Sequence, residues 1–423
     1  MQKLRICGGK PLLGTVSVSG AKNAAVGVLP AALMATGESV IENLPNIEDV
    51  RLFADIFRKM GAEVEMNGSS MRLSGEGMRN PRADFELVSR MRASYYLLGS
   101  MLGKFGRAEV ALPGGCFIGV RPIDLHIKGM EALGADLRIE RGILKAEAPN
   151  GLRGADIYLD TVSVGATINI MLAAVWANGQ TVIANAAKEP HVVDVANFLN
   201  CIGASVKGAG TDVIRINGGR PLKGCSYAII PDQIEAGTYM IAAAAAGGEV
   251  TVRNVIPTHL EAVTAKLMEM GYSVTEGDDG REFYIEVRSD GQRPRGVNVR
   301  TLPYPGFPTD LQQPIMALLT RNRDASQVYE TIYEDRFKHV PYLCRMGAEI
   351  SVSGRVATVY GVEKLYGCPV TASDLRAGAS LIVAGLMADG ITTIDSVDYI
   401  DRGYEDVEHK LRGLGADVER IEE

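Results

Sequence analysis

The chain has 423 residues, of which 46% are hydrophobic and 22% charged, and its formal net charge at pH 7 is −7. A chain of this length exceeds what one ordinary core accommodates, so we expect two domains. The acidic balance leaves no broad basic field for nucleic acid or for an anionic membrane surface, so neither is expected as a partner.

The N-terminal stretch MQKLRICGGK lacks the apolar segment of a signal peptide. The most apolar short run, Met240–Ala246, is far below the length that crosses a bilayer. The cysteines lie far apart, with neither CxxC spacing nor a histidine partner, at positions Cys7, Cys116, Cys201, Cys225, Cys344 and Cys368. This pattern predicts reduced thiols rather than disulfides or a zinc site, and a cytoplasmic location.

One structural unit recurs six times along the chain. In each copy an apolar residue, a glycine and a small or polar residue end an amphipathic helix and lead into an alternating strand. The glycines are spaced about 70 residues apart, at Gly61, Gly134, Gly203, Gly271, Gly347 and Gly415. A glycine directly after a helix supplies the left-handed cap conformation, so all six are predicted to cap helices.

Two further elements repeat in the same register. A common strand template opens at a glycine in Gly37–Asn43, Gly179–Asn185, Gly248–Asn254 and Gly390–Ser396. A second, largely apolar helix begins at small or polar residues in each copy, and its apolar composition predicts burial on most sides. These helix starts are Lys22–Ala25, Met91–Ser94, Ser163–Thr167, Asp232–Thr238, Asp310–Gln312 and Asp374–Ser380.

The repeats therefore predict six βαβαββ-like units, which close as three plus three into two similar halves. An open solenoid is the alternative that the pattern leaves open. Pro231-Asp232 is a natural crossing between the halves, and a second crossing follows if the N-terminal strand, Leu4–Val18, pairs with the far half. We expect one domain over residues 22–230 and the other over residues 1–21 and 231–423.

The stretch Leu112–His126, LPGGCFIGVRPIDLH, is a candidate reactive loop. Glycines precede the single thiol of Cys116, Arg121-Pro122 follows it, and Asp124 begins an amphipathic helix. An electropositive and partly exposed setting makes a thiol selectively reactive. The alternative is a buried structural cysteine, which is the common role of a free cysteine.

Three cations stand at the starts of buried helices: Lys22, Arg92 and Arg376. Helix N-termini attract anions, so a cation there opposes the helix dipole and suggests a bound anion. Asp232 and Thr167, in contrast, are typical of structural N-caps.

Nine motifs, taken in order, resemble the UDP-N-acetylglucosamine 1-carboxyvinyltransferase family of enolpyruvyl transferases, and the resemblance runs essentially from end to end. They are Ser19–Asn23, Met91–Ser94, Leu112–Cys116, Arg121–Asp124, Ser163–Thr167, Pro308–Asp310, Glu334–Phe337, Asp374–Gly378 and Asp401–Tyr404.

The resemblance implies an α/β fold of two inside-out α/β barrels, each built from three repeats, with the active site in the cleft between the domains. It also implies a reaction in which the enolpyruvyl group of phosphoenolpyruvate passes to the 3-hydroxyl of UDP-N-acetylglucosamine and phosphate is released. The family proceeds by addition and elimination through a tetrahedral ketal, without a metal or an organic cofactor.

The resemblance also assigns roles to residues. Phosphoenolpyruvate needs fixed cations, and arginine forks suit both its carboxylate and its phosphate. The candidates are Lys22, Arg121, Arg402, Arg92 and Arg376. Cys116 is implied as the proton donor, Asp310 as the base for the attacking hydroxyl, and Asp374 as a participant in proton transfer, with helix capping as its alternative role.

For the nucleotide-sugar, the resemblance implies contacts with Arg121, Pro122, Ile123, Asp124 and Leu125 around the uridine. The helix end at Ser163, Val164 and Gly165 is expected to meet the diphosphate, and Ile332 the nucleotide-sugar. Asn23 and Arg336 are further expected substrate contacts. Many members carry a lysine where this chain has Thr161, so one diphosphate contact is in doubt.

Three alternative functions compete with this one. The related enzyme that acts on shikimate 3-phosphate shares the barrels but lacks the Gly-Gly-Cys loop. A non-catalytic paralogue that binds nucleotide-sugar has no use for Cys116, Asp310, Lys22 and Arg402 together. A purely structural repeat protein leaves the cations at helix starts unexplained.

Overall fold

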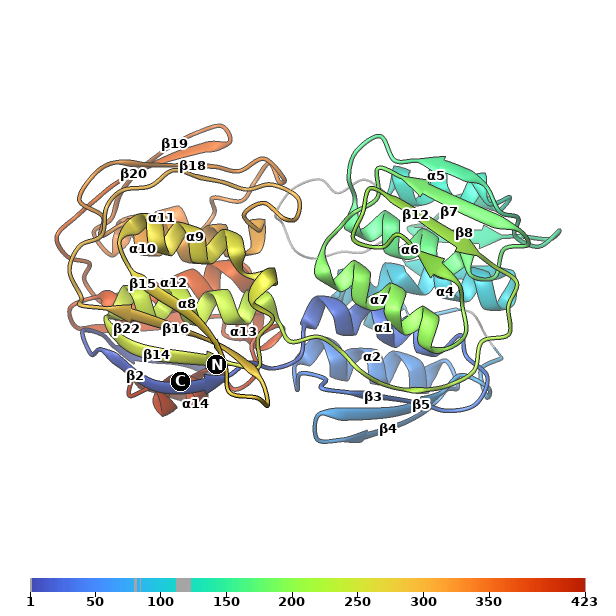
Figure 1. Cartoon of the computed structure of the whole chain (residues 1–423), viewed down its shortest axis with the longest axis horizontal. Coiled ribbons are helices and arrows are strands. Elements are labelled where there is room, and N and C mark those ends of the chain that lie inside the picture. Colours follow the sequence, from blue (N-terminus) through green and yellow to red (C-terminus); the bar gives the residue numbers. More distant parts are fainter. Residues whose placement is uncertain (1, 80–81, 84, 112–122, 423) are drawn as a thin grey trace. The chain divides into compact units, whose positions relative to one another are not determined.

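The computed structural model describes residues 2–79, 82–83, 85–111 and 123–422 (Figure 1). These residues form two compact units. Residues 2–19 and 231–422 make up the terminal unit, and the described residues between 20 and 230 make up the middle unit. Gly20 and Ala21 belong to the middle unit, so the first crossing lies two residues earlier than the sequence suggested.

The middle unit contains three sheets, with strand orders β13-β3-β5-β4, β6-β8-β7 and β11-β12-β10-β9. Its elements are, in order, α1 (Lys22–Ala32), β3 (Ser39–Glu42), α2 (Glu48–Lys59), β4 (Glu63–Asn67), β5 (Ser70–Ser74), α3 (Phe85–Arg90), the 3-10 helix η1 (Arg92–Tyr95), α4 (Tyr96–Phe105), β6 (Arg107–Ala111), α5 (Asp124–Ala132), β7 (Asp136–Glu140), β8 (Ile143–Glu147), β9 (Asp156–Tyr158), α6 (Val164–Ala174), β10 (Gln180–Ala184), α7 (Pro190–Cys201), β11 (Val206–Lys207), β12 (Val213–Asn217) and β13 (Ser226–Ala228).

The terminal unit also contains three sheets, with strand orders β21-β22-β1-β23, β15-β16-β14-β2 and β17-β18-β20-β19. Its elements are β1 (Gln2–Cys7), β2 (Leu12–Ser17), α8 (Gln233–Ala246), β14 (Gly248–Arg253), η2 (Pro257–His259), α9 (Glu261–Met270), β15 (Ser273–Asp278), β16 (Phe283–Ser289), β17 (Val299–Arg300), η3 (Thr309–Leu311), α10 (Gln312–Leu319), β18 (Ser326–Tyr329), α11 (Val340–Arg345), β19 (Glu349–Ser353), β20 (Val356–Tyr360), β21 (Pro369–Thr371), α12 (Leu375–Met387), β22 (Ile391–Asp395), α13 (Asp398–Asp401), α14 (Val407–Gly413) and β23 (Asp417–Glu422).

The start of the chain completes two sheets of the terminal unit. Where the sequence predicted one strand over Leu4–Val18, the structure has two, because the chain turns between Gly8 and Pro11. Strand β1 lies between β22 and β23 and is antiparallel to both, and β2 runs parallel to β14. In the same way β13, at the end of the middle unit, pairs in parallel with β3 near its start. Each unit is therefore closed by a strand from the other end of its own sequence.

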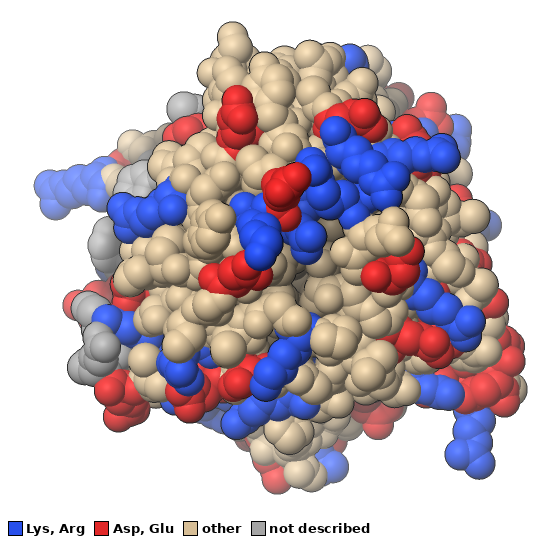
Figure 2. Space-filling model, turned by 90° about the vertical axis from the view of Figure 1, so that its left-hand side faces the viewer, with Lys and Arg blue, Asp and Glu red and all other residues tan. Residues whose placement is uncertain are grey.

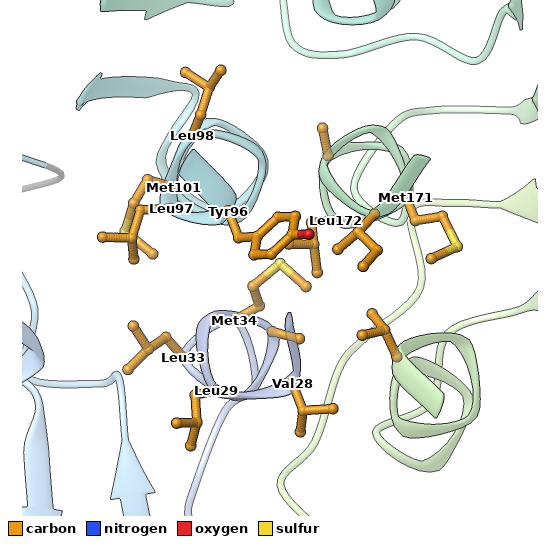
Figure 3. Close-up of a cluster of buried hydrophobic side chains, with 14 of the residues drawn as sticks. Val28, Leu29, Leu33, Met34, Tyr96, Leu97, Leu98, Met101, Met171 and Leu172 are labelled. Carbon is orange, nitrogen blue, oxygen red and sulfur yellow. The ribbon is translucent and has the colours of Figure 1, made fainter. Parts of the chain in front are cut away.

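In each unit, three helices are buried along almost their whole length. In the middle unit they are α1, α4 and α6, whose apolar side chains converge on one another in Figure 3. In the terminal unit they are α8, α10 and α12. Close packing depends on Gly99 of α4, because a Cβ atom there would lie 2.2 Å from the backbone oxygen of Asn169 in α6. These three buried helices form the inside of each unit, and the sheets lie around them (Figure 1).

The six predicted helix-capping glycines all have positive φ, between 89° and 109°. The strand template is confirmed as β3, β10, β14 and β22, and the residue after each of these strands also has positive φ: Asn43, Asn185, Asn254 and Ser396. The three asparagine side chains donate to a carbonyl at the end of the neighbouring parallel segment, the Ile229, Leu159 and Val18 oxygens respectively. These asparagines therefore hold the ends of the edge strands β13, β9 and β2 by hydrogen bonds, a role that the sequence pattern alone did not reveal.

The surface carries charges of both signs. Figure 2 shows the side of the terminal unit that lies at the left of Figure 1, where lysine and arginine side chains are interspersed with aspartate and glutamate. Within the described ranges, no helix has the length and hydrophobicity needed to span a membrane.

Candidate active site

In the terminal unit, two arginines hold the carboxylate of Asp310. Asp310 lies in η3, directly before the buried helix α10, and its side chain is 26% exposed. Arg336 Nη2 donates to Oδ1 at 2.7 Å, and Arg376 Nη2 donates to Oδ2 at 3.0 Å. Arg336 precedes α11, and Arg376 is the second residue of α12. The structure thus brings together three residues that are far apart in the sequence and were each expected at the site.

These contacts fix the charge of Asp310. Burial alone would raise the pKa of the carboxyl group, but the guanidiniums of Arg376 and Arg336 hold it well below its usual range. Asp310 is therefore an ionised carboxylate across the physiological pH range, with each oxygen occupied by one guanidinium.

Asp374 caps a helix. Its Oδ1 accepts from the backbone N–H groups of Arg376 and Ala377, at 2.9 and 3.1 Å. This is the geometry of an N-cap, the alternative role that the sequence left open. The carboxylate also lies near the buried ring of His339, whose pKa burial lowers to about 4 although Asp374 opposes that effect.

Two of the three cations at helix starts, Lys22 and Arg376, have partners within the protein. Arg376 shares the carboxylate of Asp310 with Arg336, and Lys22 at the start of α1 forms a 2.9 Å ion pair with Asp49 of α2. The side chains of Lys22 and Asp49 are only 13% and 4% exposed. Buried charges of this kind are tolerated when they are paired, so the dipole argument alone does not demand a ligand.

Glu330 is a site residue that sequence reasoning missed. It follows β18, and it is 1% exposed. Its carboxylate accepts from four donors, the hydroxyl groups of Thr301 and Thr309 and the backbone N–H groups of Ile332 and Tyr333. Glu330 therefore fixes both Thr309, next to Asp310, and the half-buried Ile332. The sequence does offer a signal for Glu330. It is the residue directly after strand β18, and in three other repeats the residue directly after the corresponding strand is an asparagine.

In the middle unit, the start of α6 has the expected form. Ser163 is the N-cap, and its hydroxyl accepts from the N–H of Ala166 at 3.3 Å. Val164 and Gly165 open the first turn and are half-buried, and Thr161 is exposed. The first N–H groups of a helix have no partner within the helix, so such a helix start suits an anionic group.

A buried histidine borders this helix start. His126 in α5 is 8% exposed, and a Cβ atom on Gly165 would lie 3.1 Å from its Nε2 atom. Asn169 Nδ2 lies 2.9 Å from His126 Nδ1. Asn169 also donates to the carbonyl of Tyr95 and accepts from the N–H of Gly99. Sequence reasoning stopped at Leu125 and missed His126, which faces the inner side of its helix.

The remaining candidates are placed as follows. Asn23 is the second residue of α1 and is half-buried; Ile123 and Leu125 are half-buried beside the exposed Asp124. Arg402 follows α13 and is half-buried, and the preceding Asp401 binds Arg420 through both oxygens at 2.8 Å. Arg92 begins η1. Three candidates lie outside the described residues: Cys116, Arg121 and Pro122.

A metal site was not expected. Across residues 2–79, 82–83, 85–111 and 123–422, no three histidine, cysteine, aspartate or glutamate side chains are grouped so that they could hold a metal ion.

Comparisons with known proteins agree with the motifs. A family model described as EPSP synthase (3-phosphoshikimate 1-carboxyvinyltransferase) matches residues 6–411. The chain is 57% identical over 423 residues to UDP-N-acetylglucosamine 1-carboxyvinyltransferase 3 of Caldanaerobacter subterraneus subsp. tengcongensis, covering 100% of both chains. It is 54% identical over 420 residues to UDP-N-acetylglucosamine 1-carboxyvinyltransferase 2 of Bacillus subtilis, covering 99% of this chain and 97% of that one.

Solved structures confirm the two-domain α/β fold. The enolpyruvyl transferase NikO from Streptomyces tendae superimposes with a TM-score of 0.88 at 26% identity, covering 99% of each chain. EPSP synthase from Acinetobacter baumannii superimposes with a TM-score of 0.76 at 20% identity, over 100% of each chain, which shows likeness of fold alone. The resemblance in the nine motifs is thereby confirmed: the chain belongs to the EPSP synthase family of enolpyruvyl transferases, and within it to the UDP-N-acetylglucosamine 1-carboxyvinyltransferases.

Proposed function

We propose that this protein transfers the enolpyruvyl group of phosphoenolpyruvate to the 3-hydroxyl of UDP-N-acetylglucosamine and releases phosphate, a step of peptidoglycan synthesis. The observation that carries the proposal is identity of 54–57% along the whole chain with relatives that bear this enzyme's name. The ionised carboxylate of Asp310, positioned by two arginines, supports it from the structure.

The addition step needs a proton donor and a proton acceptor. In the proposal, the Cys116 thiol gives its proton to the methylene carbon of phosphoenolpyruvate, and the sugar 3-hydroxyl attacks the neighbouring carbon. Asp310 accepts the hydroxyl proton. A carboxylate of low basicity suffices, because the hydroxyl proton becomes strongly acidic as the new C–O bond forms.

The product of addition is a tetrahedral ketal, which loses phosphate and a methyl proton to restore the double bond. Lys22, Arg121 and Arg402, with Arg92 and Arg376, are proposed to bind the carboxylate and phosphate of phosphoenolpyruvate. Asp374 caps the N-terminus of α12. We propose that it also takes part in proton transfer during the elimination.

The nucleotide-sugar is assigned to the middle unit. We assign the uridine to Arg121–Leu125, where Asp124 can accept from the ring N–H and Pro122 can pack on the ring. The diphosphate is assigned to the start of α6, where the Ser163, Val164 and Gly165 N–H groups and the helix dipole favour an anion. The exposed Thr161 adds no charge to that contact.

Phosphate release tests the proposal. The purified protein is given phosphoenolpyruvate alone, with UDP-N-acetylglucosamine, or with shikimate 3-phosphate, and inorganic phosphate is measured. We expect release with UDP-N-acetylglucosamine only. Release with shikimate 3-phosphate would favour the related enzyme named by the family model, and no release with either acceptor would favour a non-catalytic paralogue.

The Arg402→Ala variant refines the test. If Arg402 binds phosphoenolpyruvate, its loss raises the KM for phosphoenolpyruvate far more than the KM for the nucleotide-sugar. Equal effects on both would remove Arg402 from the phosphoenolpyruvate site.

A further inference from the structure

We propose that Tyr404 is a positioning residue that holds the guanidinium of Arg376 against Asp310 and so fixes the orientation of the Asp310 carboxylate. The inference rests on the proposed function, in which Asp310 is the base. Tyr404 belongs to the Asp401–Tyr404 motif, in which sequence reasoning gave a role to Arg402 alone.

Tyr404 is buried between two of the inner helices of the terminal unit. It is 3% exposed, and its hydroxyl lies 2.9 Å from Thr238 Oγ1 of α8 and 3.2 Å from Arg376 Nη1 of α12. The Arg376 guanidinium also lies over the tyrosine ring, 5.5 Å from its centroid. Arg376 is itself 4% exposed, so its N–H groups depend on partners within the protein.

The direction of each hydrogen bond in this chain follows from the donors. Thr238 has a single hydroxyl proton, which it donates to the carbonyl of Ile234 at 2.7 Å. Thr238 must therefore accept from Tyr404, whose own proton points toward α8. Burial raises the pKa of Tyr404, so the phenol keeps that proton. The remaining lone pairs of the phenol oxygen accept from Arg376.

The guanidinium of Arg376 is thus fixed at both ends. Nη1 donates to Tyr404, and Nη2 donates to Asp310. A guanidinium is planar, so fixing one edge on the phenol orients the other edge toward the carboxylate. Without the hydroxyl, Nη1 loses its acceptor in a buried place, and the guanidinium must turn or shift to find another.

A displaced Arg376 changes the chemistry of Asp310. The positive charge of Arg376 and its hydrogen bond both lower the pKa of Asp310, against the effect of burial. When the hold of Arg376 weakens, that pKa rises and the carboxylate loses its orientation toward the hydroxyl that it deprotonates. Asp310 must be ionised to act as a base. The acid limb of the pH–activity profile of such a variant therefore lies at a higher pH than that of the wild type.

The test compares Tyr404→Phe with Tyr239→Phe. Tyr239 of α8 is 2% exposed, and its hydroxyl has no hydrogen-bond partner among the described residues. Both tyrosines line the same small apolar cavity, together with Thr238 and Ala242. The control therefore removes a buried phenol oxygen from the same surroundings without touching Arg376.

In phosphate-release kinetics from the lowest pH at which the protein stays folded up to pH 9, we expect Tyr404→Phe to lower kcat by about 10- to 100-fold, the range for a lost hydrogen bond to a charged group. Its acid limb should move to higher pH, while Tyr239→Phe keeps the wild-type values. Equal kcat and pH profiles for the two variants would overturn the proposal. So would a raised KM for phosphoenolpyruvate at unchanged kcat, because that result would mean that Tyr404 acts on substrate binding and not on Asp310.

Two further measurements keep the proposal testable if Tyr404→Phe folds poorly or if the wild type releases no phosphate. Thr238→Val removes the acceptor of the phenol, and Thr238→Ser keeps it, so only the valine variant should shift the profile. Crystal structures need no activity: Arg376 should leave Asp310 in Tyr404→Phe, and an unmoved Arg376 would overturn the proposal. An inactive wild type would refute the proposed function alone.

Discussion

The carboxylate of Asp310 keeps its charge inside the protein because two guanidinium groups face it directly, and the buried carboxylate of Asp49 forms an ion pair with an ammonium group. Asp310 has two such partners, and Asp49 has Lys22. Breaking a buried pair costs more than the pair itself contributes, since one charge is left without its partner. These side chains are thus constrained by stability as well as by their proposed roles in the reaction.

The thiol of Cys116 carries the most direct residue-level prediction. The epoxide fosfomycin should alkylate Cys116, and UDP-N-acetylglucosamine should speed the reaction. The exposed Cys201 and Cys344 are internal controls, because a simple reactive thiol at the surface would be labelled as well. Peptide mass spectrometry reads the outcome, and labelling spread over several cysteines would contradict a specially reactive Cys116.

Substitution separates proton donation from nucleophilicity at the same position. Cys116→Ser should lose most turnover near neutral pH, because an alcohol is too weak an acid to deliver the proton. Cys116→Asp should keep more activity and resist the epoxide, since a carboxylic acid can also donate. Wild-type turnover in Cys116→Ser would mean that another group supplies the proton.

Asp194 of α7 predicts a pH dependence of stability. It is 2% exposed, and burial raises its pKa to about 6 although the Tyr227 hydroxyl and the Ile230 N–H donate to it. Between pH about 4 and 6 the folded protein therefore holds a proton that the unfolded chain has lost, and the free energy of unfolding falls as pH rises. Above that window the penalty is constant.

Asp194→Asn removes this titration. Relative to wild type, the variant's free energy of unfolding should improve by up to about 3 kcal/mol as pH rises from 4 to 6. The single tryptophan, Trp176, lies in the same unit and reports urea unfolding by fluorescence. A difference between the two proteins that does not change with pH would exclude a raised pKa at Asp194.

At the residue scale, the sequence was sufficient to identify candidates that lie in short local motifs, such as Asp310, Arg336 and Arg376. It did not single out Glu330, His126 and Tyr404, because their contacts are with residues from other elements. The phenol of Tyr404 meets Thr238 across 166 positions of the chain, and no local spacing reports that contact. The carboxylates that pair with Lys22 and Arg376 lie on other elements, so local spacing did not reveal these pairs either.

At the scale of single elements, the repeats made the fold readable. A glycine at a helix end and an asparagine after a strand each need positive φ, so their spacing marks the same points in successive units. The split of the N-terminal strand into β1 and β2 was missed although Gly8-Gly9-Lys10-Pro11 is typical of a turn. A Cβ atom on Gly8 would lie 2.2 Å from the Ala388 oxygen, so the turn is also a close approach to α12.

The capping glycines can be tested with a matched pair in the terminal unit. Gly271 has φ 103° and Gly413 closes α14 without positive φ, and a Cβ atom on either would meet nothing within 4 Å. Gly271→Ala should lower the free energy of unfolding by about 1 to 2 kcal/mol, the cost of a left-handed alanine. Gly413→Ala should be neutral or slightly stabilising. Calorimetry that showed equal shifts would contradict a conformational origin.

At the scale of the whole molecule, both chain ends belong to the terminal unit and lie next to each other. Gln2 pairs with Glu422 across β1 and β23, as the neighbouring N and C labels of Figure 1 show. All strands of the three middle-unit sheets come from residues 20–230, whereas the terminal unit needs β1 and β2 from the chain start. The two crossings follow from this connectivity.

This connectivity predicts which fragments fold. Residues 20–230 should fold as a separate chain, and residues 231–423 should not, because β1 lies between two other strands of its sheet. Joining residues 1–19 to the end of 231–423 through a short linker should restore folding. Circular dichroism and the dispersion of amide chemical shifts in NMR spectra report whether each fragment is folded. A folded 231–423 chain without the N-terminal strands would contradict the account.

The central claim is the reaction itself, and the structure of its product tests it most directly. The protein is incubated with phosphoenolpyruvate and UDP-N-acetylglucosamine, and the nucleotide-sugar is purified. Its NMR spectra should show one vinyl methylene group. A long-range correlation between the sugar C3 proton and the enol-ether carbon should place the new group on the 3-oxygen. An unmodified nucleotide-sugar, or an enolpyruvyl group found on shikimate 3-phosphate instead, would contradict the account.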